Sequence, residues 1–247
     1  MAHISRGARA LLVVLVLFGS SCTEPEVDPC AGEGALATCL EPTMDQSYYA
    51  AMSSMYFDTM DATVDLGGQW PPYSVQVARW EWPPWLKLTA YGREDIEAVD
   101  SALRLVFPSV VPQRDCRGFG THPFGRCRVV FYYDAFEGMG CPIYEEFTFN
   151  DAGEITWIEA WSDVDGLRPT SPEDPWGEGG TDRLSSRIPG LGNDEGRIDL
   201  DSPWMAEAAA DDAEVADFVD RARDWHDAWI DEYAAASDDM WEVGCGW

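Results

Sequence analysis

The segment CPIYEEFTFNDAGEITWIEAW, residues 141–161, contains two runs in which neighbouring side chains alternate in polarity. Alternation with a period of two is typical of β-strands whose two faces meet different surroundings. Between the runs, Asn150-Asp151-Ala152-Gly153 suits a short reverse turn with Gly153 in the left-handed backbone conformation. The segment therefore predicts an antiparallel hairpin with strands over 143–149 and 155–161.

The turn also predicts which side chains of the two strands face each other. If Asn150 lies opposite Glu154, then Glu145 lies opposite Glu159, because alternate residues share one face of a sheet. The same face then carries large apolar side chains around the two acids. We therefore expect these two carboxylates in a pocket lined by Ile143, Phe147, Trp157 and Trp161.

Two carboxylates in apolar surroundings need an explanation. Like charges that face each other across a ladder destabilise it, and burial disfavours the ionised form of each acid. An arginine such as Arg79 or Arg128 could bridge them, one acid could stay protonated, or the pair could line a pocket that uses the proton. If the pocket uses the proton, Glu145 and Glu159 are candidate acid/base residues. If an arginine bridges them or one acid stays protonated, both residues are structural.

His122 is the third candidate catalytic residue. It lies in the glycine-rich segment Gly-Phe-Gly-Thr-His-Pro-Phe-Gly, residues 118–125. A histidine at the mouth of a cavity could relay protons, whereas the simpler alternative is an exposed loop residue.

The rest of the chain predicts an α+β protein with one main domain. Apolar residues at helical spacing favour helices over 44–63 and 93–107, and period-two patterns favour strands over 74–82 and 128–133. The α+β domain is expected over 44–161. An acidic excursion rich in glycine and proline follows over 162–202. A C-terminal helical segment over 203–247, including a long helix from 211 to 236 that opens with a capping box, is expected to pack on the core.

This order of elements, together with the hairpin FTFNDAGEITWIE at 147–159, resembles the nuclear transport factor 2-like superfamily and its SnoaL-like members. The resemblance covers about residues 44–161 and implies a curved antiparallel sheet wrapped on helices, a cone-shaped, cystatin-like roll. It also implies an internal cavity, which apolar side chains and one or two acids line in the enzymes of the superfamily. None of the catalytic residues of those enzymes can be assigned to positions of this chain.

The N-terminus predicts export. Two arginines precede the apolar run 10–18, which is too short to span a membrane, and small residues lead to Cys22. Residues 1–21 are thus expected to be a signal peptide. The small-small-Cys ending resembles the bacterial lipobox and implies lipidation of Cys22, with residues 22–43 as a tether. The expected location is the cell envelope, lipid-anchored; an ordinary secretory signal and a secreted soluble protein are the alternative.

The cysteines agree with export. Apart from Cys22, six remain, and an even number suits disulfides in an oxidising compartment. Local spacing favours Cys30 with Cys39 and Cys116 with Cys127, which leaves Cys141 with Cys245. A zinc site is the weaker alternative because no Cys-x-x-Cys motif occurs and the chain has only 3 histidines.

The composition limits the classes of molecule that the protein is expected to bind. Loss of the two signal-peptide arginines leaves 14 basic residues against 45 acidic ones, and such a surface repels nucleic acid and anionic lipid. We expect no cofactor and no metal; Asp163-Val-Asp165-Gly matches only a fragment of a calcium loop. Trp80, Trp82 and Trp85 could form a platform for a sugar, but packing into the core is the commoner role of such residues.

These observations predict a non-catalytic exported lipoprotein that presents a domain for a small apolar ligand or an envelope protein. The membrane is then a partner only through the lipid. The alternative is a cyclase, isomerase or dehydratase that uses acid/base carboxylates in an apolar cavity.

Overall fold

The computed structural model describes residues 30–85, 89–177, 183–234 and 238–247. The predicted signal peptide, Cys22 and the part of the predicted tether up to residue 29 lie outside these residues. In chain order the elements are η1 (Ala37–Cys39), α1 (Gln46–Tyr56), β1 (Tyr73–Glu81), β2 (Ala90–Tyr91), α2 (Arg93–Val106), β3 (Ser109–Gly118), β4 (Phe124–Tyr133), η2 (Asp134–Phe136), β5 (Gly140–Phe149), β6 (Ile155–Ser162), η3 (Leu184–Ser186), α3 (Pro203–Asp211), α4 (Ala213–Ala234) and α5 (Asp238–Cys245).

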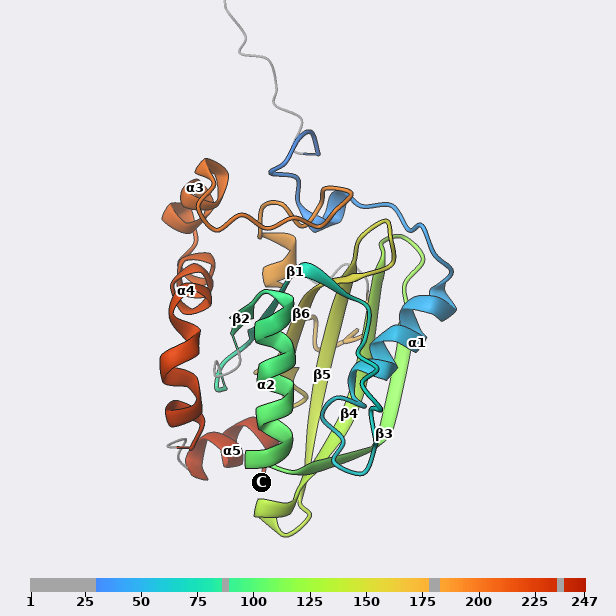
Figure 1. The fold of residues 1–247 in the computed structure, drawn as a ribbon, viewed down its shortest axis with the longest axis vertical. Coiled ribbons are helices and arrows are strands. Elements are labelled where there is room, and N and C mark those ends of the chain that lie inside the picture. The colour runs from blue at the N-terminus through green and yellow to red at the C-terminus, as the bar shows by residue number, and fades with distance from the viewer. Residues whose placement is uncertain (1–29, 86–88, 178–182, 235–237) are drawn as a thin grey trace, which may run out of the picture.

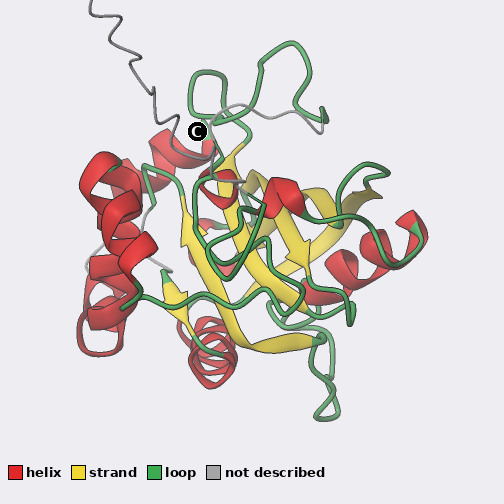
Figure 2. Ribbon diagram, turned by 90° about the horizontal axis from the view of Figure 1, so that it is seen from above, coloured by secondary structure: helices red, strands yellow, loops and turns green. Residues whose placement is uncertain are grey.

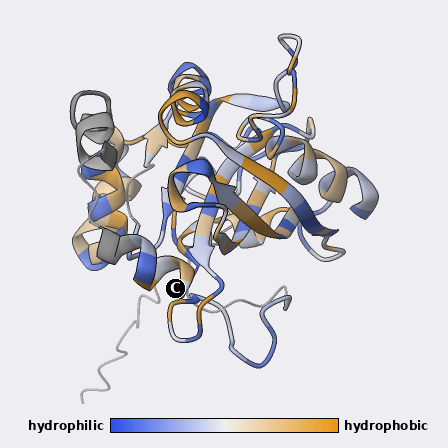
Figure 3. Cartoon of the chain, turned by 90° about the horizontal axis from the view of Figure 1, so that it is seen from below, coloured by the Kyte–Doolittle hydropathy of each residue, from blue (hydrophilic) through white to orange (hydrophobic). Residues whose placement is uncertain are grey.

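The fold is α+β, as the sequence predicts, with a curved sheet of six strands in the order β2-β1-β6-β5-β4-β3 (Figure 1). Strands β3 to β6 form an antiparallel meander. Strand β1 pairs with β6 in parallel, so the sheet is mixed rather than purely antiparallel. The hydrophobic segments gather in the middle of the molecule, and the surrounding helices carry both polar and apolar positions (Figure 3).

The two faces of the sheet carry separate cores. We call the face covered by α1 and α2 the inner face; its core includes Tyr56, Phe131 and Phe147. The outer face is covered by residues 183–200 and by α3 and α4, and its core includes Trp157 and Phe218. Figure 2 shows helices and loops on both sides of the strands. Since both faces are buried, charged residues of the central strands have to find partners inside the protein.

Three disulfides form as predicted: Cys30–Cys39 and Cys116–Cys127, which local spacing favours, and the remaining pair Cys141–Cys245. The third connects β5 to the end of α5, across 104 residues of sequence. Such bridges form and persist in oxidising compartments, and this agrees with an exported protein. Among the described residues, no helix is both long and apolar enough to cross a membrane.

Several predicted boundaries are wrong. The first helix ends at Tyr56 rather than Thr63, because the chain turns to pair Asp61 with Ser109. Strand β3 was not predicted; it is a polar edge strand and contains Pro112. The last long helix is capped by Asp212, not by a capping box at Asp211, because the Asp212 carboxylate accepts the amide protons of Glu214 and Val215. The predicted 211–236 helix corresponds to α4 (Ala213–Ala234), and α5 (Asp238–Cys245) is a further helix within the C-terminal segment.

Candidate functional site

The predicted hairpin forms, but its register changes just after the turn. Asn150 pairs with Glu154 and Gly153 has φ 78°, both as predicted. Phe149 then faces Ile155, whereas Thr148 faces Trp157, so Thr156 is an extra residue in β6. This is a β-bulge, which leaves two residues of one strand opposite one of the other.

The bulge separates the two glutamates that were expected to face each other. Glu145 pairs with Ala160 on the inner face, and Glu159 pairs with Glu146 on the outer face. The predicted cross-strand pair of Glu145 and Glu159 is therefore wrong. Any joint acid/base chemistry of these two residues loses its geometric basis.

The bulge also divides the predicted apolar lining. Ile143 and Phe147 belong to the inner core, and Ile143 lines a cavity there. Trp157 and Trp161 lie on the outer face and pack under α4 and the excursion. The four residues thus do not share one pocket.

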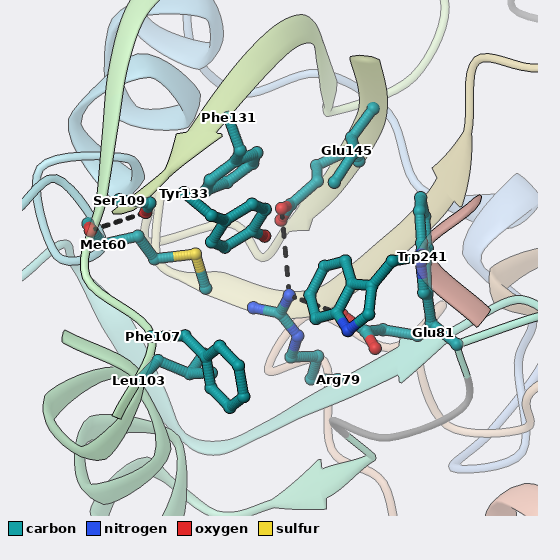
Figure 4. Close-up of a pocket in the computed structure, with 12 residues that line it drawn as sticks. Met60, Arg79, Glu81, Leu103, Phe107, Ser109, Phe131, Tyr133, Glu145 and Trp241 are labelled. Carbon is teal, nitrogen blue, oxygen red and sulfur yellow. Dashed lines mark hydrogen bonds and ion pairs between the residues drawn. The ribbon is translucent and has the colours of Figure 1, made fainter. Parts of the chain in front are cut away.

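A small cavity of about 30 Å³ lies between the inner face and the helices α2 and α5 (Figure 4). This volume accommodates about two water molecules. Three charged residues line it, Arg79, Glu81 and Glu145, and the rest of the wall is largely apolar. The other lining residues are Met60, Trp85, Leu103, Phe107, Ser109, Phe131, Tyr133, Ile143 and Trp241.

The charged residues of the cavity are only partly paired. The Arg79 Nη2 atom lies 3.1 Å from Glu81 Oε1 and 3.8 Å from Glu145 Oε1. Arg79 and Glu145 are 2% and 1% exposed. Yet Arg79 Nε and Nη1 and Glu145 Oε2 have no hydrogen-bond partner. Figure 4 shows a guanidinium nitrogen of Arg79 turned away from both glutamates, toward the space beside Met60 and Phe107.

Two acids in or near the cavity, Glu145 and Asp100, have higher pKa values than exposed acids. The pKa of Glu145 is raised to about 8, mainly by burial; Arg79 opposes the rise, and Glu81 and Asp100 add to it. Burial likewise raises the pKa of Asp100 to about 6, against the effects of Arg79 and of the Tyr73 hydroxyl. That hydroxyl donates to Asp100 Oδ2 over 3.0 Å. Glu145 is therefore mainly protonated at neutral pH and can donate a hydrogen bond.

Glu159 has a fully occupied carboxylate on the outer face. The indole nitrogens of Trp82 and Trp157 donate to it over 2.5 and 3.2 Å. The backbone amides of Leu184 and Ser185, at the start of η3, donate over 2.7 and 2.9 Å. Because four donors already surround its oxygens, Glu159 holds the excursion on the sheet, and nothing in its contacts resembles an acid/base site.

Its neighbour Glu146 is held by two arginines. Arg126 donates to Oε2 from Nε and Nη2, over 2.8 and 2.6 Å, and Arg183 pairs with Oε1. All three side chains are almost fully buried. Although burial alone would raise the pKa of Glu146, the two guanidinium groups outweigh it and lower the pKa.

His122 lies away from the cavity. Its Nδ1 is 3.4 Å from the Leu40 carbonyl oxygen, and its ring is 5.3 Å from that of Phe124, which belongs to the outer core. The structure thus brings Glu145, Glu159 and His122 to three different places.

The remaining alternatives have structural explanations. Trp80, Trp82 and Trp85 are buried, so they form no exposed sugar platform. Both carboxylate oxygens of Asp163 are engaged by arginines, Oδ2 by Arg128 and Oδ1 by Arg168. This occupancy leaves little room for the calcium alternative.

Sequence reasoning missed most of the cavity residues, including Glu81 and Trp241. Glu81 follows Arg79 by two positions in a predicted strand, and this spacing alone could have placed both on one face. Trp241 gave no such signal, because α5 reaches the cavity only through tertiary packing and the Cys141–Cys245 bridge.

Neither a protein-family model nor a curated protein matches the chain. Solved structures do. One is a protein of unknown function with a cystatin-like fold from Methylobium petroleophilum PM1: 15% identity, TM-score 0.42, covering 53% of this chain and 97% of that one. A SnoaL-like protein of unknown function from Burkholderia thailandensis E264 has 15% identity and TM-score 0.35, covering 49% and 99%. An NTF2-like protein from Burkholderia xenovorans LB400 has 12% identity and TM-score 0.37, covering 49% and 92%.

Two of these structures are described as a SnoaL-like and an NTF2-like protein, the group that the sequence resembles. The likeness concerns about half of the chain and the arrangement of its elements. No activity is transferred from it.

Proposed function

We propose that the chain is an exported envelope lipoprotein whose α+β unit binds a small molecule with an apolar body in the inner cavity, without catalysing a reaction of it. One observation carries this proposal: buried polar atoms of Arg79 and Glu145 lack partners in a cavity whose other walls are largely apolar. Buried polar groups are nearly always hydrogen-bonded, so unpaired ones are a reason to expect a bound molecule.

Binding is the better-supported class because no catalytic set is assembled: Glu145, Glu159 and His122 lie in three different places. Small-molecule sites are typically about 300–1,000 Å³, and this cavity is about 30 Å³, so it fits only a very small ligand unless its walls move. The second candidate is a cyclase, isomerase or dehydratase, and the protonated state of Glu145 at neutral pH favours it. Such an enzyme would have to act through Glu145 alone, without Glu159 or His122, and after Trp241 has moved.

Filling the cavity is expected to abolish ligand binding. Screening of small aliphatic and aromatic compounds by ligand-observed NMR should find binders of the wild-type protein. A ligand at a hundredfold excess over its Kd should raise the free energy of unfolding by about 2.7 kcal/mol. Leu103→Phe, which places a larger side chain at the cavity wall, should remove this increase.

Val75→Phe is the matched control, since Val75 is 72% exposed and lies outside the cavity. The proposal predicts the same ligand stabilisation in this control as in the wild type. Equal stabilisation of the Leu103→Phe protein would place the ligand elsewhere and contradict the proposal.

The lipid anchor is tested separately. Cys22→Ala should move the protein from the membrane fraction to the soluble fraction of the envelope. Intact-mass measurement of the wild type should show the added acyl groups. A Cys22→Ala protein that stays in the membrane fraction would rule out this anchor and leave the secreted form as the alternative.

A further inference from the structure

We infer that the inner cavity selects an uncharged ligand with one oxygen acceptor on a slender aliphatic body, such as a short alcohol or ketone, and excludes carboxylates. The inference rests on the proposed function, because it specifies which small molecule the cavity accepts. It is carried by the charge balance, the unpaired donors and the shape of the cavity.

The charge balance of the cavity disfavours ions. The charge of Arg79 is already balanced by Glu81 at 3.1 Å, and Glu145 is a second acid at 3.8 Å. A ligand carboxylate would add another acidic group to a site that has only one cation among its lining residues. An ammonium group would instead meet Arg79. Because burial of an unbalanced charge is costly, a neutral ligand fits best.

The unpaired donors call for an oxygen acceptor. Arg79 Nε and Nη1 and the indole Nε1 of Trp85 have no hydrogen-bond partner, and both residues line the cavity. A hydroxyl or carbonyl oxygen can accept from such a donor without adding charge. A hydrocarbon would leave these buried donors unpaired, so the cavity should distinguish an alcohol from an alkane of the same length.

The shape of the cavity limits the ligand body. Trp241 packs its ring against those of Tyr133 and Phe136, with centroids 5.0 and 5.1 Å apart, and against Phe107 at 6.0 Å. Phe107, Tyr133 and Trp241 of this aromatic group form part of the cavity wall. Because the cavity volume is only about 30 Å³, a ligand longer than a few atoms fits only if a wall residue such as Trp241 moves.

The test compares ligands of equal length with different head groups. The mature wild-type protein at neutral pH is titrated with ethanol, acetate, ethylammonium and ethane-saturated buffer, and binding is followed by protein-observed NMR. We expect ethanol to bind at least tenfold more tightly than either ion and more tightly than ethane. Equal or tighter binding of acetate would overturn the inference.

Two variants assign the effect to named side chains. Arg79→Lys keeps the positive charge but loses the guanidinium fork, so ethanol affinity should fall at least fivefold, while the ranking of alcohol above carboxylate remains. Trp241→Ala should shift the preferred alcohol from ethanol to 1-butanol. An unchanged length preference would show that Trp241 does not limit the ligand.

The outcomes separate the two proposals. If neither the wild type nor the Trp241→Ala protein binds any of these compounds or any other small molecule, the proposed binding function fails. If carboxylates or amines bind best, the cavity is a ligand site but the selectivity inferred here is wrong. Should Arg79→Lys not fold, the comparison of head groups on the wild-type protein still decides.

Discussion

The stability of the protein is expected to fall as the pH rises from about 5 to about 8, and Glu145→Gln should remove most of this fall. In the unfolded chain Glu145 loses its proton near its ordinary pKa of 4.5, whereas in the folded protein burial raises the pKa to about 8. Between these values the folded state holds a proton that the unfolded state has lost. Rising pH therefore favours unfolding.

The expected size of this effect is large. One titrating group changes the free energy of unfolding by at most about 1.4 kcal/mol per pH unit within its window. Glutamine resembles a protonated glutamate in size and does not titrate. The wild type and Glu145→Gln should therefore be similarly stable near pH 5, and the variant should be more stable by several times this amount at pH 9.

Denaturant unfolding at a series of pH values from 5 to 9 measures the difference. Asp100→Asn is the control, because the pKa of Asp100 is raised only to about 6. The stability difference between this variant and the wild type should therefore stop growing once the pH exceeds about 6. Parallel pH profiles of the wild type and Glu145→Gln would mean that Glu145 is ionised in the folded protein at neutral pH.

Replacement of Glu146 is expected to destabilise the protein strongly at every pH where it is ionised. The side chains of Arg126 and Arg183 are 0% and 3% exposed, and both pair with this one carboxylate. Glu146→Gln removes the carboxylate charge with which both buried guanidinium groups pair. Breaking a buried pair in this way costs about 3–5 kcal/mol.

Glu154→Gln provides the matched control. Glu154 and Arg93 form a pair at 3.8 Å with side chains 40% and 39% exposed, and exposed pairs contribute about 0–1 kcal/mol. Urea unfolding of both variants at neutral pH compares the two sites. If Glu146→Gln lost no more stability than Glu154→Gln, the outer-face charge cluster would not be a main support of the fold.

The same cluster should hold part of the excursion in place. Arg126 also donates to the carbonyl oxygens of Pro175 and Gly177. We therefore expect faster proteolysis near residues 175–177 in Glu146→Gln than in the control. Faster cleavage in this variant would show that the ion pairs of Glu146 in the central sheet also hold residues 175–177 on its outer face.

Local sequence determined the elements whose cause lies within a few residues. The turn at 150–153 depends on Asn150, whose side-chain oxygen accepts the amide protons of Ala152 and Glu154, and on Gly153 in the left-handed region. The alternation in β5 placed Ile143, Glu145 and Phe147 on one face correctly. Close spacing also identified the disulfide partners Cys30–Cys39 and Cys116–Cys127, since short loops join them.

Only the tertiary structure decided which face Glu159 occupies. The bulge at Thr156 shifts β6 by one residue, and a shift of one reverses every side chain beyond it. The parallel ladder between β1 and β6 is irregular at the same level, and Gly196 of the excursion packs directly on Thr156. These contacts join residues far apart in sequence, so no pattern within the hairpin could reveal them.

The tertiary structure also decided which arginine pairs with each buried acid. Arg79, named from the sequence as a possible bridge, does approach Glu145, but Arg128 pairs with Asp163 and Glu146 takes Arg126 and Arg183. Alternation along a strand determines on which face a charge lies, because it depends only on backbone geometry. Which opposite charge meets it depends on how distant segments pack, and that information lies in the folded chain as a whole.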